Sequence, residues 1–168
     1  GARWYIKPVA EATTAWGRQT IMDTIELAEK VGLMVVYGDT DRVFVKNEPD
    51  KIERVTAQIG NTLGLEIKPD KVYKRILFTE AKKRYCGLLP DDRLDIVGLE
   101  VIRGDWAAVA KNLQEKVLDT ILKKKPPKEA AEFVRRYISD LREKKLPYRD
   151  LIIWKTLTKP AEEYAVRA

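Results

Sequence analysis

The chain has 168 residues, of which 45% are hydrophobic and 35% are charged, and its formal net charge is +6. This composition is ordinary for a globular protein with one core, or with a core and a smaller attached piece. The chain contains one cysteine, Cys86, and no histidine. It therefore cannot build a disulfide framework, a cysteine-cluster or histidine-ligated zinc site, or Ser-His-Asp or Cys-His catalysis. No apolar run approaches the ~18 residues of a membrane span, so we expect no membrane association and a cytoplasmic, intracellular setting.

Charge is unevenly distributed along the chain. Residues 1–70 hold 9 basic and 11 acidic side chains, whereas residues 71–168 hold 23 basic and 15 acidic side chains. A near-neutral first part and a basic second part favour a localised site in the first and a polyanion-binding surface in the second. A solvated, lysine-rich face is the alternative interpretation of the second part.

The first predicted elements are a helix, a β-hairpin and a second helix. A proline in the first turn, apolar residues at helical spacing and a closing glycine predict a helix between Pro8 and Gly32. The apolar stretches "LMVVYG" and "RVFVKN" flank "DTD" at 39–41, which predicts a hairpin that carries acids at its turn. Apolar residues at helical spacing predict the second helix over about 49–63.

The next part of the chain is predicted to be β-structure. "VYKRILFTEA", "KRYCGLL" and "RLDIVGLEVI" are β-prone, and "PDD" separates the last two as a turn. Cys86 lies in the middle stretch and is expected to be a small packed residue rather than a reactive thiol.

The final part of the chain is predicted to be mainly helical. Asp105 is the expected N-cap of a helix that ends before two prolines, and another helix is expected over about 127–144. "RDLIIWKTLTKP" predicts one more short strand or extended segment. The order of elements predicts an α+β fold, in which residues 1–100 form an antiparallel sheet with packed helices and residues 101–168 form a small helical portion.

The predicted hairpin turn concentrates negative charge. In an extended backbone Asp39 and Asp41 share a face, while Thr40 and Arg42 point the other way. Two close carboxylates repel each other unless a cation lies between them, and the hard divalent ions Mg²⁺ and Mn²⁺ prefer such oxygen ligands. Gly38 is expected to leave room for a bulky substrate. An isolated D-x-D is more often a solvated turn, but the apolar strands on both sides indicate a rigidly held one.

Several segments resemble family B DNA polymerases, and the archaeal members most closely. "YGDTD" is similar to the family's metal-binding hairpin, and "KKRYCGL" is similar to its K-K-x-Y segment. "DIVGLEVIRGDW" resembles the strand that leads into the thumb, "LTKPAEEY" resembles the later thumb, and "GARWYIKPVAEATTAWGR" resembles the region after the fingers helix. These matches occur in the family's order and cover nearly the whole chain. They imply that residues 1–100 are the C-terminal part of a palm and that residues 101–168 are part of a thumb.

The resemblance implies a DNA-directed DNA polymerase, a nucleotidyltransferase that uses two Mg²⁺ ions. Asp41 matches a main metal ligand of the family and Asp39 matches a nearby contributing carboxylate, so these two are the expected catalytic and metal-binding residues. A further carboxylate, outside this chain, is expected to complete the site. The residues expected to support the hairpin are Tyr37, Gly38 and Thr40.

The resemblance also implies contacts with a primer-template duplex. Lysine contacts to phosphates are independent of sequence, and a donor in the minor groove meets acceptors on every base pair. By strand alternation Lys83 and Tyr85 share a face, and Lys83 is assigned to the minor groove. The full set of expected DNA-binding residues, including two on the thumb, is Lys82, Lys83, Arg84, Tyr85, Arg103 and Lys159.

The implied partners are primer-template DNA, a deoxynucleoside triphosphate and the remaining polymerase polypeptide, with the N-terminal, exonuclease, fingers and upstream palm parts. We therefore expect a nucleoid-associated chain that is active only with those parts, either as a subunit of a split polymerase or as a piece of a longer one. Arg42 stands where the family usually has serine, which leaves open a catalytically inactive, polymerase-like DNA-binding or scaffold subunit. By alternation Arg42 is expected to point away from the metal face.

Overall fold

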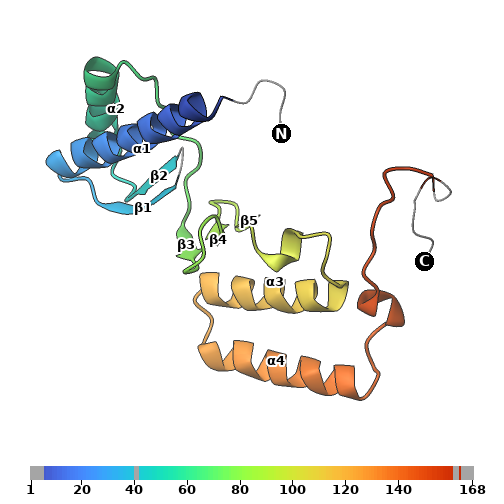
Figure 1. Ribbon diagram of the computed structural model, residues 1–168. Helices are drawn as coiled ribbons and strands as arrows, with labels where there is room; N and C mark the ends of the chain where they lie inside the picture. The colour runs from blue at the N-terminus through green and yellow to red at the C-terminus, as the bar shows by residue number, and fades with distance from the viewer. Residues whose placement is uncertain (1–5, 40–41, 161–162, 164–168) are drawn as a thin grey trace. The chain divides into compact units, whose positions relative to one another are not determined.

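The computed structural model describes residues 6–39, 42–160 and 163. The chain divides into two compact units, residues 1–72 and residues 73–168. Each unit has its own buried core, and Figure 1 labels the helices and strands of both units.

The first unit is a β-hairpin packed against two helices. Helix α1 (Lys7–Lys30) is followed by strands β1 (Val35–Asp39) and β2 (Arg42–Val45) and by helix α2 (Pro49–Leu63), as the periodicity predicts. Both helices have a proline in their first two positions, where the missing N–H is not needed. The core residues come from α1, α2 and the segment before β1, and they are Ala28, Leu33, Val55 and Ile59.

The second unit begins with a three-stranded antiparallel sheet. Strands β3 (Arg75–Phe78), β4 (Tyr85–Leu88) and β5 (Leu94–Val97) are hydrogen-bonded in chain order. The central strand is buried along its whole length. It pairs with β3 on one side and with β5 on the other, so β4 is not an edge strand.

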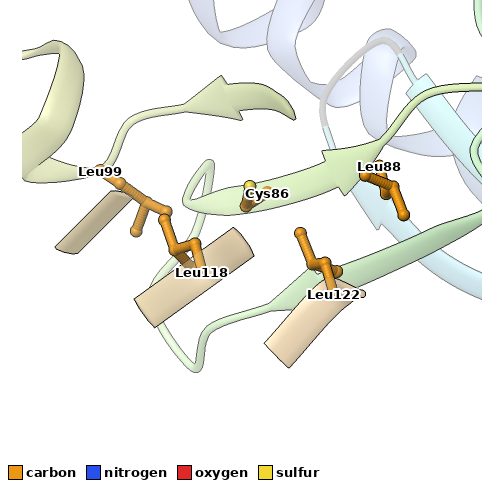
Figure 2. Close-up of a cluster of buried hydrophobic side chains, with 5 residues drawn as sticks. All are labelled: Cys86, Leu88, Leu99, Leu118 and Leu122. Atoms are coloured by element: carbon orange, nitrogen blue, oxygen red, sulfur yellow. The ribbon is translucent and has the colours of Figure 1, made fainter. Parts of the chain in front are cut away.

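Helices cover this sheet and extend the second unit. The 3₁₀ helix η1 (Glu100–Ile102) leads to α3 (Ala108–Leu122), α4 (Pro127–Arg142) and a second 3₁₀ helix η2 (Tyr148–Leu151). Helices α3 and α4 lie side by side (Figure 1). The core joins β4 and the segment before η1 to α3, as Figure 2 shows for the side chains of Cys86, Leu88, Leu99, Leu118 and Leu122.

One predicted feature of the second unit is wrong, and another is only partly met. Asp105 is not the N-cap of α3, because the helix begins at Ala108 and Ala107 occupies the cap position without a side-chain hydrogen bond. The Asp105 carboxylate instead accepts hydrogen bonds from Arg103. The described residues that follow η2 contain no strand, although the backbone at Ile152 is extended.

The mixed architecture, with small antiparallel sheets and four α-helices among the described residues, confirms the predicted α+β class. The boundary between the two compact units along the chain falls between Val72 and Tyr73. This division lies inside the segment assigned to the palm, so the palm and thumb boundary at 100/101 stays a prediction. Within the part of the chain that the structure describes, no helix combines the length and apolarity of a membrane span.

Candidate functional site

The acidic hairpin is formed by β1 and β2 of the first unit. β1 ends at Asp39 and β2 begins at Arg42. Thr40 and Asp41, which carry two of the predicted roles, lie outside the described residues. Asp39 itself is half-buried, at the point where an otherwise apolar strand ends.

The strand register determines which way each hairpin side chain points. Val35 pairs with Val45, but the next pair is Tyr37 with Phe44, so a bulge lies between Val35 and Tyr37. A bulge changes which face the following side chains occupy. After it, Tyr37 lies on the same face as Phe44, and their ring centroids are 5.8 Å apart.

Asp39 lies after the bulge, and the contact of Gly38 with helix α1 indicates which face of the hairpin the Asp39 side chain occupies. A Cβ added at Gly38 would lie 3.3 Å from Ile25 Cδ1, so the Gly38 position faces helix α1. Because successive residues alternate between faces, Tyr37 and Asp39 point away from α1. The carboxylate of Asp39 therefore lies on the face of the hairpin that the helices do not cover. Gly38 accommodates α1 at this point, and the role predicted for it, room for a bulky substrate, stays a prediction.

The position of Arg42 differs from the prediction. Arg42 is directly opposite Asp39 in the antiparallel pair, and directly opposite residues have their side chains on the same face. Alternation along one extended chain predicted the reverse, because that argument does not hold across the connection between two strands. The exposed Arg42 guanidinium is therefore on the same side as the Asp39 carboxylate.

The described residues do not form a metal site by themselves. They contain no group of three or more acidic, cysteine or histidine side chains arranged to hold a metal ion. Asp39 supplies the kind of hard oxygen donor that Mg²⁺ prefers. The chemistry of its carboxylate fits one ligand of a divalent ion.

The second predicted group of site residues lies at the connection between β3 and β4. Lys82 and Lys83 are exposed in a turn, and Lys83 has a positive φ of 60°. The strand begins only at Tyr85. The prediction that Lys83 and Tyr85 alternate along one strand is therefore wrong, because Lys83 belongs to the turn.

The two residues after the lysines turn into the protein. Tyr85 is 5% exposed, and its ring centroid lies 5.8 Å from that of Phe78. The Arg84 guanidinium forms an ion pair with Glu100. Cys86 is 0% exposed, and burial, followed by the charges of Asp95 and Glu115, raises the pKa of its thiol to about 11. The prediction of a packed, unreactive cysteine agrees with this environment.

The two residues assigned to the thumb are both at the surface. Arg103 donates from Nε and Nη2 to the two carboxylate oxygens of Asp105, at 2.9 and 2.7 Å. The hydrogen bond from Arg103 is the main cause that lowers the pKa of Asp105 to about 2. Lys159 is exposed in the irregular segment after η2.

Two residues of the site escaped the sequence reasoning. Glu100 accepts from Arg84 with one carboxylate oxygen and from Gln114 Nε2, at 2.8 Å, with the other. The signal in the sequence was an acid inside the apolar run "IVGLEVI", where an unpaired charge would be costly to bury.

Comparison with known proteins identifies the family. The model of DNA polymerase family B matches residues 2–168. "DNA polymerase 2" of Aeropyrum pernix is 51% identical over 166 residues, which are 99% of this chain and 21% of that protein. The DNA polymerase of Archaeoglobus fulgidus is 43% identical over 166 residues, which are 97% of this chain and 21% of that protein.

A solved structure gives the same result. The family B DNA polymerase from the hyperthermophilic archaeon Pyrobaculum calidifontis matches with a TM-score of 0.73 and 47% sequence identity, over 99% of this chain and 22% of that one. The chain belongs to DNA polymerase family B, as its motifs predict, and resembles archaeal members. It spans about a fifth of the length of the two relatives named above.

Proposed function

We propose that this chain supplies metal-binding carboxylates and duplex contacts to a template-directed DNA polymerase. The observation that carries the proposal is the position of Asp39, at the end of a bulged apolar strand and on the face away from α1, in a chain of this family. Asp41 is the proposed main metal ligand and Asp39 the second. Primer-template DNA, a deoxynucleoside triphosphate and the rest of the polymerase polypeptide, with a further carboxylate, are the proposed partners.

The proposed reaction is nucleotidyl transfer to a primer end. Two bound Mg²⁺ ions would supply activation of the primer 3′-hydroxyl and neutralise charge on the attacked and leaving phosphate oxygens. The contribution of this chain is to hold its carboxylates in fixed positions. The pairing of Tyr37 with Phe44 beside Asp39 and the packing of Gly38 against α1 limit the freedom of the strand that presents the acid.

The proposed duplex contacts are centred on the turn of the second unit. Lys82 and Lys83 are exposed there, and their ammonium groups suit sequence-independent contacts with DNA. Tyr85 and Arg84 would support this turn from within the protein, because one is buried and the other is paired with Glu100. Arg103 and Lys159 are proposed as further contacts.

The test is Mg²⁺-dependent primer extension by the active polymerase that contains this chain, whether one polypeptide or an assembly. Asp41→Asn is expected to lower the extension rate by about three orders of magnitude or more, because it removes a ligand charge. Asp39→Asn is expected to cause a smaller loss. Duplex affinity, measured at one salt concentration, should remain close to that of the parent in both variants.

Asp50→Asn is the matched control, since it removes one exposed acid from the first turn of α2 in the same unit. It is expected to leave extension unchanged. An Asp41→Asn enzyme that extends primers at the parental rate would overturn the proposed role of the hairpin.

A second candidate function is an inactive, polymerase-like DNA-binding subunit. The observation that favours it is the register of Arg42 opposite Asp39, because a guanidinium on the metal face competes with a cation for the carboxylate. On this interpretation the hairpin variants are silent. Only Lys82→Ala and Lys83→Ala would then change the behaviour of the complex, by lowering duplex affinity and its salt dependence.

A further inference from the structure

We propose that Glu100 and Gln114 are positioning residues that hold the Lys82–Lys83 turn in its DNA-contacting geometry by way of Arg84. The inference rests on the proposed function, in which these lysines contact the duplex. It adds two residues that act through Arg84 and that lie on different elements from the lysines, η1 and α3.

The backbone of the turn is fixed at its last two residues. The carbonyl oxygen of Arg84 accepts from the backbone N–H of Thr79 at 3.1 Å and from the Thr79 hydroxyl at 3.0 Å. Gly98 has a φ of +65°, and a Cβ added there would lie 2.1 Å from the carbonyl oxygen of Lys83. The segment that follows β5 therefore packs directly against the backbone of the turn.

The conformation of Lys83 requires this support. Its φ of 60° is in the left-handed region, which costs a residue with a side chain on the order of 1 kcal/mol or more. Such conformations persist where the surroundings fix them. Because Arg84 directly follows Lys83, the hydrogen bonds and the ion pair that fix Arg84 also restrict the backbone of Lys83.

The side chain of Arg84 is held by Glu100. The pair is largely shielded from solvent, with 34% of the Arg84 side chain and 17% of the Glu100 side chain exposed. Among the side chains that the structure describes, Arg84 also has a buried Nε without a hydrogen-bond partner. Glu100 is therefore the ionic partner that compensates the half-buried guanidinium, since a charge removed from water without a partner is unfavourable.

Gln114 fixes the orientation of Glu100. Its Nε2 donates to Glu100 Oε2 at 2.8 Å, and its Oε1 accepts from the backbone N–H of Val101 at 2.9 Å. The hydrogen bond from Gln114, the backbone of Glu100 and the Arg84 guanidinium together lower the pKa of Glu100. Glu100 is thus ionised at neutral pH, and a continuous chain of polar contacts joins α3 to the turn.

The direction in which one substitution changes duplex affinity distinguishes a positioning role from a general charge effect. Glu100→Gln removes a negative charge, and electrostatics alone would make the protein bind DNA more tightly. Positioning requires the opposite, because Arg84 loses its ionic partner and the turn loses its support. The expected result is a loss of duplex affinity of about threefold to tenfold, within the range for residues coupled in one network.

The measurement is duplex affinity of the active polymerase that contains this chain, at several salt concentrations, in a double-mutant cycle. The variants are Glu100→Gln, the pair Lys82→Ala with Lys83→Ala, and all three together. The lysine pair should flatten the log–log salt dependence by about 1 to 2. Glu100→Gln should weaken binding in the parent and have no further effect once the lysines are gone.

The matched control is Glu115→Gln, which makes the same charge change at the exposed residue next to Gln114 on α3. It should leave affinity unchanged or slightly raised. If Glu100→Gln does not fold, as judged by thermal unfolding, Gln114→Ala replaces it, since that variant keeps the Arg84–Glu100 pair and removes only its orientation. The expected loss is then smaller and is again absent without the lysines.

The outcomes separate the inference from the function on which it rests. If the lysine pair weakens binding but Glu100→Gln leaves it unchanged, tightens it, or adds to the lysine effect independently, the positioning role is wrong and the lysine contacts stand. If the lysine pair itself has no effect, the proposed contacts are wrong and the positioning role is wrong with them.

Discussion

The two compact units hold the side chains proposed to be functional in different ways. In the first unit, Asp39 lies on a hairpin whose neighbouring residues make apolar contacts: Gly38 faces Ile25, and the Tyr37 ring lies beside the Phe44 ring. In the second unit, Lys82 and Lys83 lie in a turn that is held by side-chain hydrogen bonds and an ion pair. The first arrangement depends on packing and the second depends on ion pairs and hydrogen bonds.

This difference matches the two kinds of task proposed for them. A metal ligand must be held within a fraction of an ångström, and close-packed apolar contacts provide that precision. A lysine contacts phosphate as a point charge on a flexible stem, so the turn beneath it needs less precision than a metal ligand does. We therefore expect substitutions in the two units to change the free energy of unfolding in different ways. Those in the first unit remove packing, and those in the second unit add or remove single groups.

The largest expected effect on stability comes from the core of the first unit. Ile59 is 0% exposed, and Ile59→Ala should lower the free energy of unfolding by about 2–5 kcal/mol, because it removes buried methyl groups and leaves a cavity. Ile67→Ala, at an exposed isoleucine, is the control and should change it little.

Hydrogen exchange then shows whether the two cores are independent. The buried clusters of the two units share no residue, so loss of amide protection in Ile59→Ala should be confined to the first unit. An equal loss of protection in strands β3, β4 and β5 would show that the cores are one cooperative structure, and the comparison between the units would fail.

An intermediate effect is expected from a methyl group added to the second unit. A Cβ at Gly87 would lie 2.2 Å from Tyr73 Cδ1, and Tyr73 cannot move freely because its hydroxyl donates to Asp95 Oδ2 at 2.5 Å. Gly87→Ala should therefore destabilise the protein by about 1–3 kcal/mol in denaturant unfolding. Gly104→Ala, where nothing lies within 4 Å of the added Cβ, is the control.

The steric origin of this effect has its own check. If the Tyr73 ring is the obstacle, Gly87→Ala should cost much less in a Tyr73→Ala background, since residues in contact are not additive. An undiminished cost there would place the obstacle elsewhere in the strand.

The smallest expected effect is a pH dependence in the core of the second unit. The pKa of Cys86 is raised from 9.0 to about 11 in the folded protein. Between these values the folded state binds more protons than the unfolded state, so stability decreases as pH rises above about 9. Unfolding free energies at pH 7 to 10 should fall with pH in the parent and fall less steeply in Cys86→Ala, and parallel slopes would contradict the assignment.

The secondary structure could be predicted because its signals are local. Helical spacing with a proline at the start placed α2 at its observed bounds, and apolar runs placed both strands of the hairpin. The bulge could not be predicted, because the run "VVY" offers no sign of which residue is extra. The prediction for Arg42 is wrong for a related reason: the face of the hairpin that Arg42 occupies depends on its pairing with Asp39, which alternation along a single strand does not fix.

The predicted roles of the site residues stay predictions, and the polar contacts that support the lysine turn were not predicted. The motif resemblance led to Asp39, Asp41 and the lysines, but treating "KKRY" as strand put Lys83 in the wrong element. The prediction that Asp105 caps α3 is wrong, because the Asp105 carboxylate accepts hydrogen bonds from Arg103, two residues earlier, and α3 begins only at Ala108. The link between Glu100 and Gln114 joins residues far apart along the chain, and only the fold brings them together.

The order of the strands has a consequence for how the chain acquires its structure. In the described residues every strand pairs with its neighbour in sequence, β1 with β2 and β3 with β4 and then β5. Such pairing gives a low contact order, for which loop-closure entropy is small and folding is fast. During synthesis at about 5–20 residues per second, the acidic hairpin can pair while the lysine turn is still inside the ribosome. The Asp39 carboxylate would then be in place before the Lys82–Lys83 turn has formed.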